Sequence, residues 1–292
     1  MVTLSDGVGE ATIVPDLGAG VASYDLLIEG RREALFRPCR NPLEAQPFDL
    51  ALNLLVPWSN RISGGGFVFG GEFHRLEPNL PGEPFPIHGN AFSCPWKIES
   101  RAPTKVMLSL NSIGPGPFCY TARVTYEIRG GGLSVRLGAR NTGRNALPFG
   151  LGLHPWLPKT PQTLLQAKSE RVVLENRDHL PAGELDIRDR EDWNFETPKR
   201  LPEAWINNAF REWDGRARIL WPDRGISLDA SAEPPLTTYI LYSPAFDADF
   251  FCFEPVTHPV DAHNRPDGPN GLIVLQPEQE VSVFCRFAPS WS

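Results

Sequence analysis

The chain has 292 residues, of which 41% are hydrophobic and 22% charged, a composition typical of a folded globular protein. A net charge of −7, with no Lys/Arg run longer than a pair, argues against nucleic acid as a partner. No apolar stretch reaches the roughly 18–20 residues that cross a membrane, and the polar N-terminus lacks the apolar segment of a signal peptide. The five cysteines include no C-x-x-C pair, which indicates buried thiols in a reducing cytoplasm rather than disulfides or a zinc site.

The expected elements are strands, preceded by one short helical turn within 43–53. Residues 105–110 have a strand pattern, and apolar and polar side chains then alternate over 122–129. The same alternation resumes over 133–140, after three consecutive glycines at 130–132. A period of two on both sides of a glycine turn predicts a hairpin of two half-buried strands.

The second half of the chain continues in the same way after a polar segment. Residues 176–206, which are rich in Asp, Glu and Pro, are predicted to form a long loop. Further strand patterns lie at 216–220, 226–230, 237–242, 272–275 and 281–287. Successive strands with short turns predict an all-β fold, a large antiparallel β sandwich, and the lack of internal repeats or linkers predicts a single domain over 1–292.

Common catalytic motifs are missing from the sequence. It contains no Walker loop, no G-x-G-x-x-G after a strand, no H-E-x-x-H and no G-x-S-x-G element. The Ser-Gly-Gly-Gly run at 63–66 lacks the lysine and the helix of a phosphate-binding loop, so an ordinary loop or bulge is expected there. Nucleotide-dependent and serine-nucleophile reactions are therefore not favoured.

Four polar residues stand in unusual surroundings. His154 follows an apolar, glycine-rich run and precedes Pro155, which restricts it to extended backbone, so its imidazole is expected at the end of a strand. Glu254 ends an aromatic run, where a carboxylate is costly to bury unless it is paired or used. His88 and Arg61 lie in two further clusters. Taken singly, each of these residues is open to a structural reading as well as a functional one.

A series of short segments extends over nearly the whole chain, although each is weak evidence alone. The series comprises Val14-Pro15-Asp16-Leu17-Gly18-Ala19, Asn60-Arg61-Ile62, Ile87-His88-Gly89, Trp96, Asn141, Pro148, Gly152-Leu153-His154-Pro155, Glu254-Pro255 and Asp261-Ala262-His263-Asn264. In order and spacing it resembles the aldose 1-epimerase (galactose mutarotase) family, in its branch of shorter bacterial chains.

The resemblance implies a reaction and a role for each matching residue. The family interconverts the α and β anomers of a free aldose by opening and closing its ring, on a large antiparallel β sandwich. Glu254 matches the family's catalytic base and His154 its catalytic acid, while His88 and Arg61 match residues that hold and polarise the sugar. The expected partner is a small-molecule sugar bound by a monomer or homodimer, with no cofactor and no metal.

The sequence departs from the family pattern at a position expected to bind the sugar. Many relatives have an Asp in an Asp-x-x-Phe element, and Asn207 stands at that place here. An amide donates as well as accepts hydrogen bonds, but it carries no charge and cannot help to hold His154 protonated. The family's His-Pro-Tyr-Phe also reads His-Pro-Trp-Leu at 154–157, which is expected to reshape the pocket floor.

The chemistry of a cyclic hemiacetal explains why an acid and a base are needed. Ring opening removes the proton of the C1 hydroxyl while the ring oxygen is protonated, and a paired base and acid avoid a charged intermediate. With ordinary pKa values Glu254 is ionised at neutral pH, and its charge is expected to favour the imidazolium of His154. Either Trp58 or Trp156 could offer its face to the C–H side of the sugar.

Three alternatives remain open on the sequence. A phosphorylated or sulfonated hexose would need further cations in the cleft, for which Arg75 and Arg265 are candidates. A non-catalytic sugar-binding protein on the same fold is expected to lack the acid or the base, and both residues are present. A metal site built from His88, His154 and Glu254 lacks the spacing of a ligand motif.

Overall fold

The structure is a computed structural model that describes residues 1–245, 247–266, 268 and 270–292. The described residues form strands β1 to β24 and five single-turn 3-10 helices, without an α-helix. The 3-10 helices are η1 (Pro47–Asp49), η2 (Ile187–Asp189), η3 (Glu191–Trp193), η4 (Pro222–Arg224) and η5 (Ala262–Asn264). In this part of the chain no helix is both long enough and apolar enough to cross a membrane.

The larger of two main sheets contains eleven strands of the described chain, each antiparallel to its neighbours. In spatial order it runs β1 (Val2–Ser5), β2 (Gly9–Val14), β3 (Gly20–Ile28), β5 (Leu52–Leu55), β13 (Gly152–Pro158), β22 (Phe250–Val256), β21 (Thr238–Ser243), β18 (Ile206–Arg211), β15 (Arg171–Glu175) and β16 (Pro181–Asp186), with β4 (Arg31–Ala34) beside β3. Strands β13 and β22, which carry His154 and Glu254, are adjacent at its centre.

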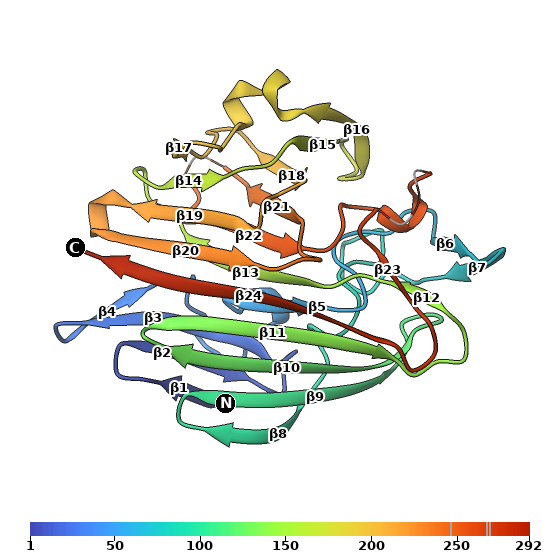
Figure 1. Ribbon diagram of the computed structural model, residues 1–292, viewed down its shortest axis with the longest axis horizontal. Helices are drawn as coiled ribbons and strands as arrows, with labels where there is room; N and C mark the ends of the chain where they lie inside the picture. Colours follow the sequence, from blue (N-terminus) through green and yellow to red (C-terminus); the bar gives the residue numbers. More distant parts are fainter. Residues whose placement is uncertain (246, 267, 269) are drawn as a thin grey trace.

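The smaller main sheet has nine strands within the described residues, and two further pairs of short strands lie outside both sheets. Its order is β17 (Lys199–Arg200), β14 (Leu164–Ala167), β19 (Arg216–Trp221), β20 (Ile226–Ala232), β24 (Glu280–Trp291), β11 (Gly132–Asn141), β10 (Cys119–Arg129), β9 (Lys105–Ile113) and β8 (Lys97–Ala102). The short pairs are β12 (Leu147–Phe149) with β23 (Ile273–Leu275), and β6 (Gly66–Phe69) with β7 (Glu72–Arg75). Figure 1 shows β8 to β11 and β24 running side by side, with the β6–β7 hairpin projecting from one side of the molecule.

The core lies between the two main sheets because alternate side chains of each strand point to the same face. Val124 and Tyr126 of β10 and Phe251 and Phe253 of β22 are all buried in one apolar cluster. Residues of even number in β22 therefore point to the opposite, outer face of the larger sheet. Glu254 belongs to this second set, which places it on the outer face, above a smaller apolar cluster of Leu55, Val173, Ala209, Ile240, Val256 and Val260.

The structure confirms the predicted all-β antiparallel sandwich and each predicted strand. The hairpin appears as β10 and β11, which pair from Tyr120 with Asn141 to Arg129 with Gly132. Within 43–53 the helical turn is limited to η1, because β5 already begins at Leu52. The long loop predicted over 176–206 is wrong in part, since β16 and β17 lie within it. Both are edge strands without a fully buried residue, which need no alternating apolar pattern.

Candidate active site

His154 and Glu254 face each other across the two central strands of the larger sheet. Gly152 pairs with Val256 and Trp156 with Cys252, so this register sets residues 154 and 254 opposite one another. Nε2 of His154 lies 3.4 Å from Oε1 of Glu254, and the side chains are only 7% and 3% exposed. The structure thus brings together a carboxylate and an imidazole that are 100 positions apart in the sequence.

A proline follows each member of this pair, and the ladder between β13 and β22 is interrupted at that point. Pairing is present at Gly152 with Val256 and again from Trp156 onward, but not between them. Proline has no N–H to donate, so Pro155 and Pro255 cannot supply the ladder hydrogen bonds there. The prediction that His154 ends a strand is wrong, because β13 continues to residue 158 with the imidazole near its middle.

Burial shifts the two pKa values in opposite directions. It raises the pKa of Glu254 to about 8, against the attraction of the Arg61 charge, and lowers the pKa of His154 to about 3. The expectation of an ionised Glu254 beside an imidazolium is therefore wrong for the unliganded site. Between these two pKa values the pair holds one proton, which resides on the carboxyl group. Among the described residues neither Nδ1 of His154 nor Oε2 of Glu254 has a hydrogen-bond partner.

His88 lies beside His154 with its protonation pattern fixed by the backbone. Its Nδ1 accepts a hydrogen bond of 3.0 Å from the N–H of Asn60, so in the neutral ring the proton is on Nε2. Burial, together with the nearby His154, holds its pKa well below the usual value, which keeps the ring neutral. The rings of His88 and His154 are 5.3 Å apart, and Phe48 packs against both. His88 is therefore a neutral hydrogen-bond donor next to the pair.

Arg61 is held in a two-pronged ion pair at the edge of the same site. Its Nε and Nη2 donate to the two carboxylate oxygens of Glu83, at 3.0 and 2.6 Å. Both side chains are largely buried, at 13% and 12% exposure. Such a forked pair fixes the guanidinium plane while Glu83 neutralises most of its charge.

Asn207 approaches the site from β18 and is bound by a carboxylate that the sequence did not point to. Its Nδ2 donates a hydrogen bond of 3.0 Å to Glu175, at the end of β15. The same carboxylate accepts hydrogen bonds from Nδ1 of His179, at 2.9 Å, and from Nε1 of Trp205. Asn207 thus stands next to a negative charge although it carries none itself.

All five predicted site residues line one open cleft of about 190 Å³ on the outer face of the larger sheet. Its full lining is Phe48, Asn60, Arg61, Leu80, Glu83, Ile87, His88, His154, Trp156, His179, Trp205, Asn207, Tyr242 and Glu254. Trp156 is the tryptophan of the 154–157 motif and stacks on His154 at 5.0 Å and 12°. The other tryptophan considered for sugar contact, Trp58, is fully buried in the core and cannot offer a face to a ligand.

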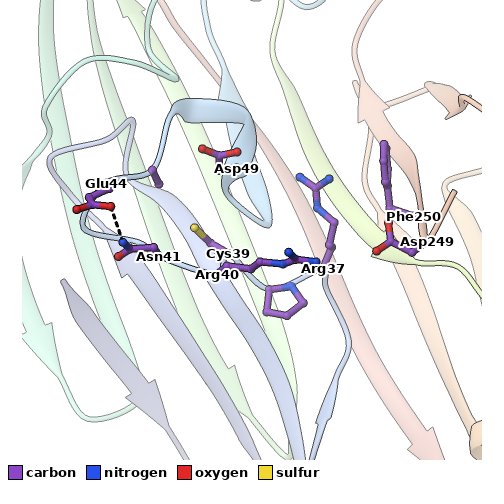
Figure 2. A pocket seen from close by; sticks show the side chains of 10 residues that line it. Arg37, Cys39, Arg40, Asn41, Glu44, Asp49, Asp249 and Phe250 are labelled. Atoms are coloured by element: carbon purple, nitrogen blue, oxygen red, sulfur yellow. Dashed lines mark hydrogen bonds between the residues drawn. The ribbon is translucent and has the colours of Figure 1, made fainter.

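A larger cavity of about 580 Å³ lies next to the cleft, around Arg37 (Figure 2). The Arg37 guanidinium is 4.2 Å from the ring centre of Trp156 and donates to the carbonyl of Phe48. Arg37 therefore supports two rings that contact His154. Figure 2 shows acidic and basic side chains mixed around this cavity, with Asp49 and Asp249 on either side of Arg37.

The arginines considered for a charged sugar do not line the described cleft, and the ligand set considered for a metal is not the one that the described residues bring together. Arg75 pairs with Glu77 on the surface, and Arg265 pairs with Glu184, so neither belongs to the described lining. A group of three ligand atoms within 4.8 Å does exist, but it joins Cys252 rather than His88 to His154 and Glu254. Burial raises the pKa of the Cys252 thiol well above its usual value, so a metal bound there would have to displace the thiol proton.

Several residues in the cleft lining or directly behind it could not have been identified from the sequence. Glu83 and Glu175 are single acids in polar segments, like many others in the chain. Phe48 and Trp205 are isolated aromatics without a motif around them. Glu83 and Glu175 act through partners 22 and 32 positions away, Arg61 and Asn207, and Phe48 contacts rings still farther away in the sequence.

Comparison with known proteins identifies the family of the chain. The aldose 1-epimerase family model matches residues 1–288. The uncharacterised Escherichia coli K12 protein YphB is 34% identical, over 81% of this chain and 83% of its own length. The uncharacterised E. coli K12 protein YihR is 27% identical, over 90% of this chain and 85% of its own length. The crystal structure of an E. coli K12 protein described as a candidate aldose 1-epimerase has a TM-score of 0.91 at 30% identity, covering 99% of this chain and 98% of that one.

A more distant structure shares the fold. A galactose mutarotase-like protein from Clostridium acetobutylicum is 16% identical and has a TM-score of 0.85, covering 99% of this chain and 95% of that one. At this identity the likeness concerns the arrangement of the sheets alone. The family match over nearly the whole sequence and the relatives with at least 30% identity carry the assignment. The chain belongs to the aldose 1-epimerase family.

Proposed function

We propose that this protein is an aldose 1-epimerase that interconverts the α and β anomers of a neutral free aldose such as galactose, glucose or arabinose. The observation that carries the proposal is the buried pair of His154 and Glu254, 3.4 Å apart at the floor of an open cleft. A carboxylate and an imidazole within reach of one small ligand are the two groups that the reaction needs. Family membership supports this class of reaction.

Ring opening in this proposal begins with the pair in its charged form. The Glu254 carboxylate takes the proton of the C1 hydroxyl, C1=O forms as the C1–O5 bond breaks, and His154 gives its proton to O5. The step ends with a neutral carboxylic acid and a neutral imidazole. Burial favours these neutral forms of Glu254 and His154 in the unliganded site as well. The protein environment therefore stabilises the pair as it stands after ring opening, relative to the charged pair from which the step begins.

Reclosure runs the same transfers in reverse after rotation about C1–C2 has exposed the other carbonyl face. Atoms and electrons balance within the sugar and the two side chains, without an oxidant, reductant or covalent intermediate. The Nε2–H of His88 can donate to O5 or to a ring hydroxyl, and Arg61 can orient a second oxygen. Held in this way, the ring oxygen stays within reach of His154 in both directions.

The charges of the cleft favour a neutral sugar over a phosphorylated or sulfonated one. Arg61 is the one arginine among the described lining residues, and Glu83 already occupies two of its donors. Glu175 adds a negative charge behind Asn207. A dianionic phosphate would meet these carboxylates without an unpaired cation to bind it.

Fresh α-anomers of a panel of aldoses, followed by polarimetry or exchange NMR, test the proposal. Wild type should accelerate anomerisation, and Glu254→Gln and His154→Asn should each lower kcat by about 10²–10⁴-fold. Glu184→Gln, which removes a largely buried carboxylate outside the cleft, should retain turnover. Sugar binding without any acceleration would assign the protein to the non-catalytic sugar-binding class, and turnover confined to charged hexoses would contradict the neutral substrate.

A further inference from the structure

The carboxylate of Glu175 determines how Asn207 faces the cleft. It accepts hydrogen bonds from three side chains, Nδ2 of Asn207 at 3.0 Å, Nδ1 of His179 at 2.9 Å and Nε1 of Trp205. An ionised carboxylate can only accept, so the atom of Asn207 that faces it must be the amide nitrogen. The orientation of this amide, which is otherwise ambiguous between nitrogen and oxygen, is thereby fixed by chemistry.

With Nδ2 bound to Glu175, the oxygen of Asn207 remains for the ligand. Asn207 lines the cleft, and no donor among the described residues is recorded at its Oδ1. Across neighbouring strands, Asn207 is paired with Tyr242, Tyr242 with Cys252, and Cys252 with Trp156. Residues that are paired directly across strands point to the same face, so Asn207 lies on the cleft face of the sheet. The amide therefore presents an acceptor on the face that carries the catalytic pair.

Two aromatic side chains prevent Glu175 from turning away. The rings of His179 and Trp205 stack at 5.3 Å and 29°, and Trp205 also packs edge-on against Tyr242 at 5.2 Å. Each stacked ring donates its N–H to the carboxylate. Glu175 itself is not part of the cleft lining, so it acts on the ligand through Asn207.

We propose that Glu175 is a positioning residue that makes Asn207 bind a sugar hydroxyl as an acceptor, as a carboxylate at position 207 would. The negative charge needed for this orientation is on Glu175, which lies behind Asn207 and does not line the cleft. The inference rests on the proposed function, because the hydroxyl belongs to the aldose. It identifies Glu175 as a determinant of sugar recognition that no motif in the sequence marks.

A pair of reciprocal substitutions tests the proposal. In Glu175→Gln the new amide must keep its oxygen toward Nε1 of Trp205, which can only donate, so its N–H₂ faces Asn207. Asn207 must then turn its oxygen toward position 175 and present a donor to the sugar. We expect KM to rise roughly tenfold with kcat changed less than about threefold. Asn207→Asp alone places two carboxylates about 3 Å apart and should raise KM as strongly.

The double variant separates positioning from general damage. In Glu175→Gln/Asn207→Asp the new amide donates to the new carboxylate, whose second oxygen again faces the sugar, so KM should return to within about threefold of wild type. Glu184→Gln is the matched control, because Glu184 also accepts from several side chains at this edge of the sheet without lining the cleft. Additive losses in the double variant, or an unchanged KM in Glu175→Gln, would overturn the proposal.

A measurement independent of turnover distinguishes failure of this inference from failure of the proposed function. In ¹⁵N-labelled protein the side-chain amide signal of Asn207, assigned by its loss in Asn207→Asp, should shift in Glu175→Gln and stay in place in Glu184→Gln. If the Asn207 signal is unchanged in Glu175→Gln, Glu175 does not fix the orientation of the Asn207 amide, even when the enzyme is active. A shifted signal in a protein that anomerises no aldose refutes the activity and with it the role in sugar recognition.

Discussion

At the scale of single residues, Glu254 and His154 share one proton, and this predicts the pH dependence of activity. The one-proton form extends from about pH 3 to about pH 8, because burial lowers one pKa and raises the other. Above the upper limit the carboxylic acid ionises beside a neutral imidazole, and no proton remains for O5. We expect kcat/KM to be level from pH 5 to 7 and to fall about tenfold per unit above pH 8.

Initial-rate polarimetry on a buffered series checks this profile, with spontaneous anomerisation subtracted at each pH. His154→Asn should lose the profile together with most of the activity. A change in kcat/KM centred near pH 6.5, the usual pKa of an exposed histidine, would show that burial does not lower the pKa of His154.

The raised pKa of Glu254 also predicts how the stability of the protein changes when this carboxyl group is removed. Between the usual pKa of a glutamate and about 8, the folded protein holds a proton on Glu254 that the unfolded chain has released. The folded state then binds more protons, so this group makes the free energy of unfolding decrease as pH rises through that window. Glu254→Gln should remove this decrease and be more stable than wild type, with a gap in Tm that grows from pH 5 to pH 8.

Calorimetric or circular dichroism melts at four pH values measure that gap. Glu77→Gln is the reference, since Glu77 is 69% exposed in its surface pair with Arg75. A gap that stays constant with pH would contradict a buried, protonated Glu254.

Sequence reasoning reached the motif residues at this scale and missed their supports. His154, Glu254 and His88 drew attention as polar residues in apolar, proline- or glycine-flanked runs, but their predicted roles came from the resemblance to the aldose 1-epimerase family. Their pKa values could not be found, because these depend on burial by segments far away in the sequence. Glu83 and Glu175 carry no local signal, since what distinguishes them is a partner 22 or 32 positions away.

At the scale of elements, the turn that delivers His88 depends on one glycine. Gly89 has φ +65°, and a Cβ there would stand 2.1 Å from the carbonyl oxygen of Val56. Gly89→Ala should therefore displace the turn, lower stability by about 1–3 kcal/mol and raise KM through loss of the His88 donor.

Gly64 offers a matched control for this prediction, because it has the same φ of +65° with no atom within 4 Å of an added Cβ. Gly64→Ala carries the conformational cost without the collision, so it should leave KM unchanged. Denaturant melts and initial rates on both variants make the comparison. Equal behaviour of the two would show that backbone strain, and not the contact with Val56, sets the effect.

The support beneath strand β13 yields another prediction. Arg37 lies over the ring of Trp156, on which His154 stacks. Arg37→Met keeps a long apolar stem but loses the cation, and we expect kcat to fall several-fold with a smaller change in KM, because the imidazole is less firmly placed.

Arg190→Met serves as the control, since Arg190 lies over Trp193 at 3.7 Å and neither residue is part of the described cleft lining. Rates and melts for both variants decide the outcome. A loss of stability without a loss of kcat in Arg37→Met would indicate that the stack only holds the fold.

Eight of the 24 described strands were predicted, most of them strands of the smaller sheet that have one face on the core, and the strands before residue 105 were not. In β10 the alternation of buried and half-buried side chains follows the sequence pattern closely. Strand β16 could not be predicted, since an exposed edge strand has no apolar face to give it a period of two. The pairing of β13 with β22 is also beyond local reasoning, because about a hundred residues separate the strands.

At the scale of the whole molecule, the sandwich separates stability from chemistry. One face of the larger sheet joins the smaller sheet in the main core, which contains Phe251 and Phe253 of β22. The alternate residues of the same strand supply the cleft, including Glu254. Because side chains alternate strictly, one strand can serve both purposes, and substitutions on the outer face should affect activity more than folding.

The net charge of −7 and the pairing of the one lining arginine with Glu83 together predict discrimination against charged sugars. A hexose 6-phosphate approaches a negative molecule and meets Glu83 and Glu175 around the one lining arginine, Arg61. We expect kcat/KM for the phosphate ester to be at least about tenfold below that of the free hexose at low salt. The gap should narrow at 1 M salt, where the screening length falls from about 10 Å to about 3 Å.

Glu83→Gln provides the internal test of this electrostatic explanation. It leaves an uncharged side chain of similar shape beside Arg61 and so releases the guanidinium charge into the cleft. The ratio of kcat/KM for the free hexose to that for its 6-phosphate should then decrease several-fold, while Glu77→Gln on the surface leaves it unchanged. If wild type prefers the phosphate, or if Glu83→Gln leaves the ratio unchanged, the charges of the cleft do not select its substrate.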